Sequence, residues 1–203
     1  GKKTAIPKYK VIEFKNTNGA IVRLGIVAPC IDANKVKYVE YQDINLSLQS
    51  ALNDLNNKSD FIISLSHLNR LQDKKTAEDF HQLRMVLGGH EHDNMKFTSG
   101  NAQITKADAN AKSAYVHRIR YNTLTKKYKI QSELVKLDQS IPLDAEVNKL
   151  VSRWKELEWR TVREMGFDPD QEIIGSSVQY DARETTIRNQ PAIFTQMICR
   201  SML

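Results

Sequence analysis

The stretch DFIISLSH (residues 60–67) indicates which class of fold the chain adopts. It is a short run dominated by apolar residues, without the regular polar alternation of a sheet that has one face in water. Strands of this kind are usually buried on both faces, as in a parallel sheet covered by helices. The stretch therefore predicts a central parallel strand of an α/β domain.

Helical and strand-like segments alternate around this stretch. Residues 43–58 place apolar side chains near helical spacing after Asp43, a plausible N-cap, and DKKTAEDFHQL (73–83) predicts a second helix. MVLGGH (85–90) reads as another buried strand, and residues 9–31 read as a hairpin that turns at Asn18-Gly19. This order of strands and helices predicts parallel strands joined by helices.

The second half of the chain has a different pattern. AQITKADA (102–109), SAYVHRIRYN (113–122) and KYKIQSELVKLD (127–138) are strand-like, and we expect them to form a second, antiparallel sheet. Residues 144–166 predict a long amphipathic helix with Asp144 as its cap and Gly166 as its end. A further helix is expected in residues 192–203.

The net charge of +6 is spread over scattered lysines without interleaved aromatic residues. We therefore expect a solvated basic surface and no nucleic-acid polymer as partner. No apolar run approaches the 18 or so residues that cross a bilayer, so no membrane span is expected in this chain. The two cysteines, Cys30 and Cys199, are expected to be small buried hydrophobic residues.

Two of the predicted parallel strands end in histidine, where ligands of open α/β sheets bind. His67 ends the first, and His90 ends the second with His92 just beyond it. Imidazole suits zinc, iron and related metals, so the three histidines predict a metal site, the alternative being an ordinary polar turn. Gly88 and Gly89 are expected to allow close approach and unusual φ angles, and Glu91 to be a spacer that points away.

The other two histidines are expected to be structural. His81 falls inside a predicted helix and His117 inside an alternating strand, and neither has a partner at ligand spacing.

Several stretches resemble the calcineurin-like metallophosphoesterases, specifically their 5'-nucleotidase branch. The resemblance rests on SHLNRLQDKKTA (66–77), with Asp73 after the Ser-His pair, on MVLGGHEHD (85–93) and on AQITKADANAKSAYVHRIRY (102–121). It continues in LDQSIPLDAEVNKLVSRW (137–154), which is similar to the lead into the family's linker helix. The tail from residue 174 is similar to the start of the family's C-terminal domain, although Asn189, Gln190 and Pro191 depart from its pattern.

The resemblance implies part of a four-layer αββα sandwich in residues 1–141. It also implies a linker helix in 142–170 and the incomplete beginning of a substrate-binding α/β domain in 171–203. By the same resemblance, His67 and His90 bind the second metal of a dinuclear centre and His92 the first, the metals being zinc, manganese, iron or cobalt. A metal-bound hydroxide would attack the phosphorus of a phosphoester, a nucleotide in this branch. The resemblance favours a periplasmic or extracellular location.

The family's earlier motifs should precede the Ser-His strand, and none does. Gly-Asp-x-x-Asp and Gly-Asn-His are absent from the sequence, and no Asp-x-His precedes Ser66. We therefore expect a fragment of an enzyme, with no catalytic residue in these 203 residues and no hydrolysis by them alone. The alternatives are a non-catalytic binding or scaffold protein that keeps the fold and a nucleic-acid-binding α/β domain.

Overall fold

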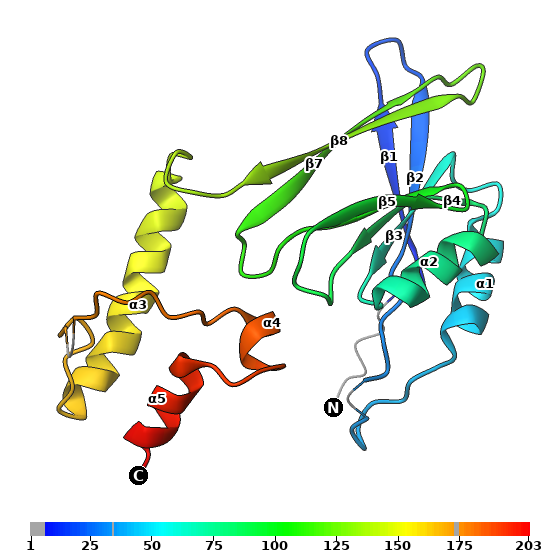
Figure 1. The fold of residues 1–203 in the computed structure, drawn as a ribbon. Coiled ribbons are helices and arrows are strands. Elements are labelled where there is room, and N and C mark those ends of the chain that lie inside the picture. Colours follow the sequence, from blue (N-terminus) through cyan, green and yellow to red (C-terminus); the bar gives the residue numbers. More distant parts are fainter. Residues whose placement is uncertain (1–6, 34, 173–174) are drawn as a thin grey trace. The chain divides into compact units, whose positions relative to one another are not determined.

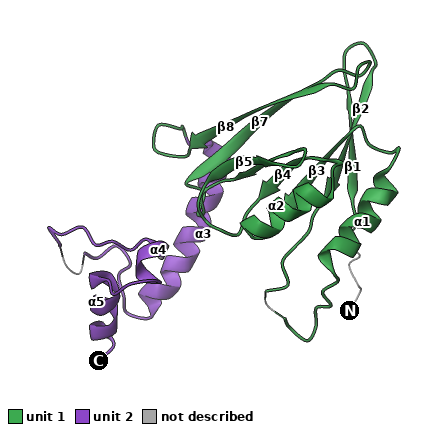
Figure 2. Cartoon of the chain, turned by 45° about the vertical axis from the view of Figure 1, so that its right-hand side comes forward, with its two compact units in different colours: residues 1–142 green, residues 143–203 purple. Residues whose placement is uncertain are grey.

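The computed structural model describes residues 7–33, 35–172 and 175–203. The chain divides into two compact units, Gly1–Pro142 and Leu143–Leu203 (Figure 2). Ile174, with which the resemblance to the C-terminal domain begins, lies outside the described residues.

The first unit is built on a six-stranded mixed sheet in the order β1-β2-β3-β4-β6-β5 (Figure 1). Its strands are β1 (Lys10–Lys15), β2 (Ile21–Val27), β3 (Phe61–Ser66), β4 (Leu83–Gly88), β5 (Met95–Ser99) and β6 (Ala102–Lys106). β2, β3, β4 and β6 run parallel, while β1 and β5 are antiparallel edge strands. The predicted central position of the DFIISLSH strand and the predicted hairpin at Asn18-Gly19 are confirmed.

Two helices cover one face of this sheet. α1 (Ile44–Leu55) begins at Asp43, whose side chain accepts a hydrogen bond from the Leu46 backbone N–H at 2.8 Å, and α2 (Arg70–Asp79) begins at Asn69 in a capping box with Gln72. Alternate strand residues face these helices, and this side holds the main core. Its most deeply buried members are Val27, Leu55, Ala77, Leu83, Val86, Ala102 and Ile104.

The opposite face of the sheet carries a separate hairpin. β7 (Ser113–Tyr121) and β8 (Tyr128–Lys136) form a two-stranded antiparallel sheet whose Tyr121 and Ile130 pack on Phe61, Ile63 and Met85. The unit thus has a helical layer, a sheet and a hairpin layer, as the turned view shows (Figure 2). This confirms the predicted α/β class.

Two expectations about local structure were wrong, and one strand was missed. β6 belongs to the main sheet instead of the second one, because a tight turn at Gly100 (φ +51°) folds it back along β5 and beside β4. The short strand β5 was not predicted at all. Cys30 and Cys199 are both exposed free thiols instead of buried residues.

The second unit is helical. α3 (Ala145–Glu164) begins at Asp144, which accepts from the Val147 backbone N–H at 2.9 Å, and ends before Gly166 at φ +90°. It carries both tryptophans of the chain, Trp154 and Trp159. α4 (Glu184–Ile187) and α5 (Ile193–Ser201) follow. No helix in the described part of the chain is long and apolar enough to cross a membrane.

Candidate functional site

The two histidines that end neighbouring parallel strands lie side by side. His67 follows β3 and His90 follows β4 by two residues, and the strands are in register with Ser66 opposite Gly88. The centroids of the two imidazole rings are 5.5 Å apart, with the ring planes at 85°. Both residues are exposed. The sheet therefore presents a pair of solvent-accessible imidazoles at the carboxyl end of its centre.

The turn after β4 has an unusual backbone, and the residues that carry it are the histidines. His90 has a φ of +82° and His92 a φ of +66°, in the left-handed region that few residues other than glycine adopt. Gly88 and Gly89 are not among the described residues with positive φ, so the expectation that the glycines supply this conformation was wrong.

The two glycines instead make room for other side chains. A Cβ on Gly88 would lie 2.8 Å from Cε and 3.0 Å from Cγ of Lys106, which is closer than carbon atoms pack. A Cβ on Gly89 would lie 3.5 Å from Nδ1 of His67, which is an ordinary contact. Gly88 is thus the position at which the Lys106 side chain crosses the end of β4.

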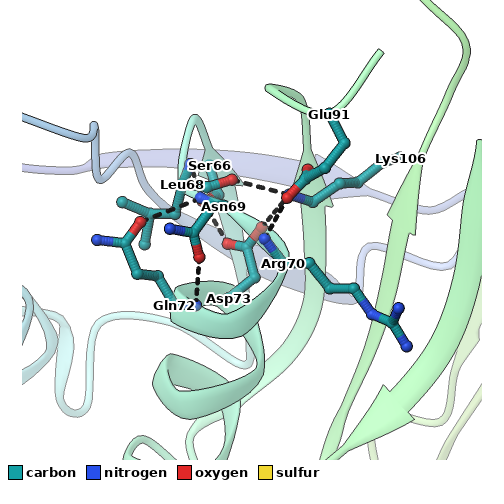
Figure 3. Close-up of polar contacts among 8 residues, drawn as sticks. All are labelled: Ser66, Leu68, Asn69, Arg70, Gln72, Asp73, Glu91 and Lys106. Atoms are coloured by element: carbon teal, nitrogen blue, oxygen red, sulfur yellow. Dashed lines mark hydrogen bonds and ion pairs between the residues drawn. The ribbon is translucent and has the colours of Figure 1, made fainter. Parts of the chain in front are cut away.

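Lys106 is the last residue of β6. Its side chain lies on the helix-covered face of the sheet and is 1% exposed. Its Nζ lies 2.8 Å from Asp73 Oδ2 and donates to the carbonyl oxygen of Leu68 at 2.8 Å and to Glu91 Oε2. All the acceptors lie at the ends of β3 and β4 or on α2 (Figure 3). One buried ammonium group at the end of β6 therefore joins the residues after β3 and the start of α2 to the turn after β4.

Asp73 is the buried carboxylate of this cluster. Its Oδ1 accepts from the Ser66 hydroxyl at 2.5 Å, and that hydroxyl oxygen accepts from the Leu68 backbone N–H at 3.1 Å. Its Oδ2 accepts no hydrogen bond from the described residues, so the ion pair with Lys106 is its main compensation for burial. Burial raises the pKa of Asp73 above its usual range, against the opposing effects of Lys106 and Ser66.

The sequence suggested that Glu91 points away from the protein, and this expectation was wrong. It is partly buried, and besides Lys106 it binds the backbone N–H of Arg70 through Oε1 (Figure 3). Burial alone would raise its pKa, but the hydrogen bonds from Lys106 and Arg70 outweigh burial and the pKa is lowered. Glu91 is therefore a charged anchor that holds the histidine turn against the start of α2.

The loop between β6 and β7 contacts the far side of the same turn. The Ala109 backbone N–H donates to the His92 carbonyl oxygen at 3.0 Å. Asn94 donates to Asp108 from both its backbone and its side chain, at 3.1 and 2.9 Å, and the Ser113 hydroxyl donates to the same carboxylate. The His90–His92 turn is thus held from two directions. The contacts of Lys106 and of this loop could not be read from spacing, because both join residues distant in sequence.

The remaining histidines lie elsewhere. α2 ends at Asp79, so His81 is an exposed residue outside the helix in which it was predicted. Residues 79–81 do form an Asp-x-His string, but they precede β4 and so lie at the opposite end of that strand from His90. His117 lies in β7, as predicted, between Ser132 and Thr105.

The donor set fits a metal ion only in part. His67 and His90 offer two exposed, neighbouring imidazoles in an edge-to-face arrangement, and imidazole is a ligand that suits zinc and related ions. Within residues 7–33, 35–172 and 175–203, no group of three or more histidine, cysteine or acidic side chains is arranged to hold one. The described residues thus bring together two side chains that could serve as metal ligands, and a complete site would need further donors.

Comparison with known proteins shows which solved structures have a similar fold. No protein-family model matches the sequence, and no curated protein sequence matches it significantly. Among solved structures, a 5'-nucleotidase precursor of Thermus thermophilus matches 97% of the chain with a TM-score of 0.70 and 18% identity, over 41% of its own length.

Two further solved structures match about three quarters of the chain. The sulfate thiohydrolase SoxB of Thermus thermophilus has a TM-score of 0.61 and 17% identity over 77% of this chain and 30% of its own. The NAD nucleotidase of Haemophilus influenzae has a TM-score of 0.55 and 15% identity over 75% and 42%. The chain spans less than half the length of each of these structures. It therefore has the fold of part of the 5'-nucleotidase structures, with the two histidines at the carboxyl ends of its central strands.

Proposed function

We propose that the chain is part of a metal-dependent phosphoester hydrolase of the 5'-nucleotidase type that acts on nucleotides. The observation that carries the proposal is the 5.5 Å pair of imidazoles, His67 and His90, on a fold shared with nucleotidases. The precursor form of one of these nucleotidases supports a location outside the cytoplasm, periplasmic or extracellular.

His67 and His90 would hold one divalent metal ion, and His92 would contribute to a second. Two such ions, when bound, polarise a phosphate oxygen and lower the pKa of water so that it can attack phosphorus. The chain's own residues bind and orient: the sheet fixes the two strand ends, and the His90–His92 turn is held by Glu91 and by the loop at Ala109. The strand ends open to solvent, which gives a phosphoester access to them.

Zinc titration of the chain tests the proposed ligand pair. We expect His67→Ala and His90→Ala each to weaken Zn²⁺ binding at least tenfold, measured by isothermal titration calorimetry. His81→Ala is the matched control, because it removes an exposed imidazole at the other end of β4. Equal affinity in the wild type and in all three variants would favour the second candidate, a non-catalytic scaffold, which the lack of a three-ligand group in the described residues supports.

A further inference from the structure

The cluster of Lys106, Asp73 and Glu91 contacts the residue that follows each of the two histidines, and it has no part in the proposed ligand set. We propose that Lys106 is a positioning residue that fixes the distance between the His67 and His90 rings before any metal binds. The role of this positioning in metal binding rests on the proposed function. The positioning itself is argued from the contacts of Lys106 alone.

Lys106 contacts the residue that follows each histidine, through a backbone carbonyl at one and a side-chain carboxylate at the other. The carbonyl oxygen to which it donates at 2.8 Å belongs to Leu68, the residue after His67. The carboxylate to which it donates on the other side belongs to Glu91, the residue after His90. A single ammonium group therefore tethers the residues that adjoin both imidazoles, so the ring separation depends on it.

Other contacts of the cluster make the tether rigid. Asp73, on α2, places its Oδ2 2.8 Å from the ammonium nitrogen of Lys106. Glu91 also contacts α2 directly, because its carboxylate accepts a hydrogen bond from the Arg70 backbone N–H. The side chain of Lys106 crosses β4 at Gly88, where no Cβ obstructs it. Charge-assisted hydrogen bonds in a buried site are strong and lose much of their competition from water.

The tether also explains how histidines can adopt the turn. Positive φ at His90 and His92 is unfavourable for residues with a Cβ, and it persists only where the surroundings impose it. Glu91 lies between them, and its side chain is fixed to both Lys106 and Arg70. Without this anchor we expect the turn to relax and the two rings to separate.

The test uses Glu91→Gln and Lys106→Met in the full 203-residue chain, with Glu133→Gln as the control. Glu133 is an exposed carboxylate in a 3.5 Å ion pair with Arg118, so its substitution removes the same charge outside the cluster. Amide hydrogen exchange in residues 88–94 is measured without metal, and Zn²⁺ affinity is measured under conditions in which each variant is folded. We expect both cluster variants to exchange about tenfold faster and to bind Zn²⁺ about tenfold more weakly.

The two readouts separate this inference from the proposed function. A merely structural role of Lys106 would lower stability but leave the Zn²⁺ affinity of the folded protein unchanged, which would overturn the inference. If His67→Ala does not weaken Zn²⁺ binding, the proposed ligand pair is wrong. Amide hydrogen exchange in residues 88–94 then tests the role of Lys106 by itself. Faster exchange in the turn supports the tether, and exchange equal to that of the wild type refutes it. Should Lys106→Met not fold, the partly exposed Glu91 still provides the test.

Discussion

The ammonium nitrogen of Lys106 lies 2.8 Å from Oδ2 of Asp73, and the two side chains are only 1% and 0% exposed. Such a pair stabilises a fold little relative to apolar residues of the same shape, because both charges lose their hydration. Removing one partner is costly, because the other charge then remains buried alone. The pair therefore makes sharp predictions about single substitutions.

Lys106→Met should lower the free energy of unfolding by about 3–5 kcal/mol, since it leaves Asp73 and Glu91 without their cation. Urea denaturation followed by circular dichroism measures this value. The control is Lys75→Met, which breaks an exposed ion pair with Asp79 on α2 and should change stability by less than about 1 kcal/mol. Equal effects of the two substitutions would contradict the buried pair.

Gly88→Ala should lower stability by about 1–3 kcal/mol, because the new methyl group would lie 2.8 Å from the Lys106 side chain and 3.2 Å from the Asp73 carboxylate. Gly89→Ala is the matched comparison, since its nearest contact is 3.5 Å away. The same denaturation experiment ranks the two variants. A larger loss at Gly89 would show that Lys106 does not cross the strand at Gly88.

Ala111→Gly should raise stability by about 0.5–1 kcal/mol. Ala111 has a φ of +52°, which is unfavourable for a residue with a Cβ, and the gain from relieving it exceeds the entropy that glycine adds to the unfolded chain. Ala109→Gly, two residues earlier and without positive φ, should instead destabilise the protein. Thermal unfolding midpoints of the two variants should move in opposite directions.

His117 should make stability fall as the pH drops below about 6.5. Burial lowers the pKa of His117 from its ordinary value of 6.5, so the unfolded chain binds a proton more readily than the folded one. Its contribution is fully present above pH 6.5 and is lost as the pH falls towards the lowered folded pKa. The Ser132 hydroxyl donates to Gln103 and so accepts from Nδ1 of the neutral ring, at 2.8 Å.

The check is a series of urea denaturations from about pH 7.5 to 5.5 on the wild type and on His117→Gln. The difference between the two curves isolates the effect of this one imidazole, because the other four histidines remain in both proteins. A difference that stays constant across this range would refute the prediction.

The chain alone should hydrolyse neither a nucleotide nor p-nitrophenyl phosphate at a measurable rate in the presence of Mn²⁺ or Co²⁺. Its described residues provide two neighbouring imidazoles and no group of three possible ligands, whereas the proposed mechanism uses two bound metal ions. The measurement is the rate of phosphate release with the chain, compared with the rate in the same metal-containing buffer without it. Robust turnover that His67→Ala abolishes would mean that the described residues suffice for catalysis.

The sequence predicted the parallel strands and the meeting of His67 and His90, because these depend on local apolar runs and on a general rule about strand ends. It failed where side chains from distant segments meet. Nothing in the pattern around Lys106 indicated its complete burial, and its strand was assigned to the wrong sheet. Glu91 was expected to point outward because its partners, Lys106 and the Arg70 backbone, are 15 and 21 residues away.

Both tryptophans lie on α3, and the first unit contains none. Intrinsic fluorescence excited at the red edge of the indole band therefore reports on the helical unit and is silent for the unit that holds the histidines. Trp154 is 62% exposed, so its emission should already be red-shifted in the native protein and change little on denaturation. Optical studies of the histidine site thus require a tryptophan introduced into the first unit, or a signal that comes from the metal itself.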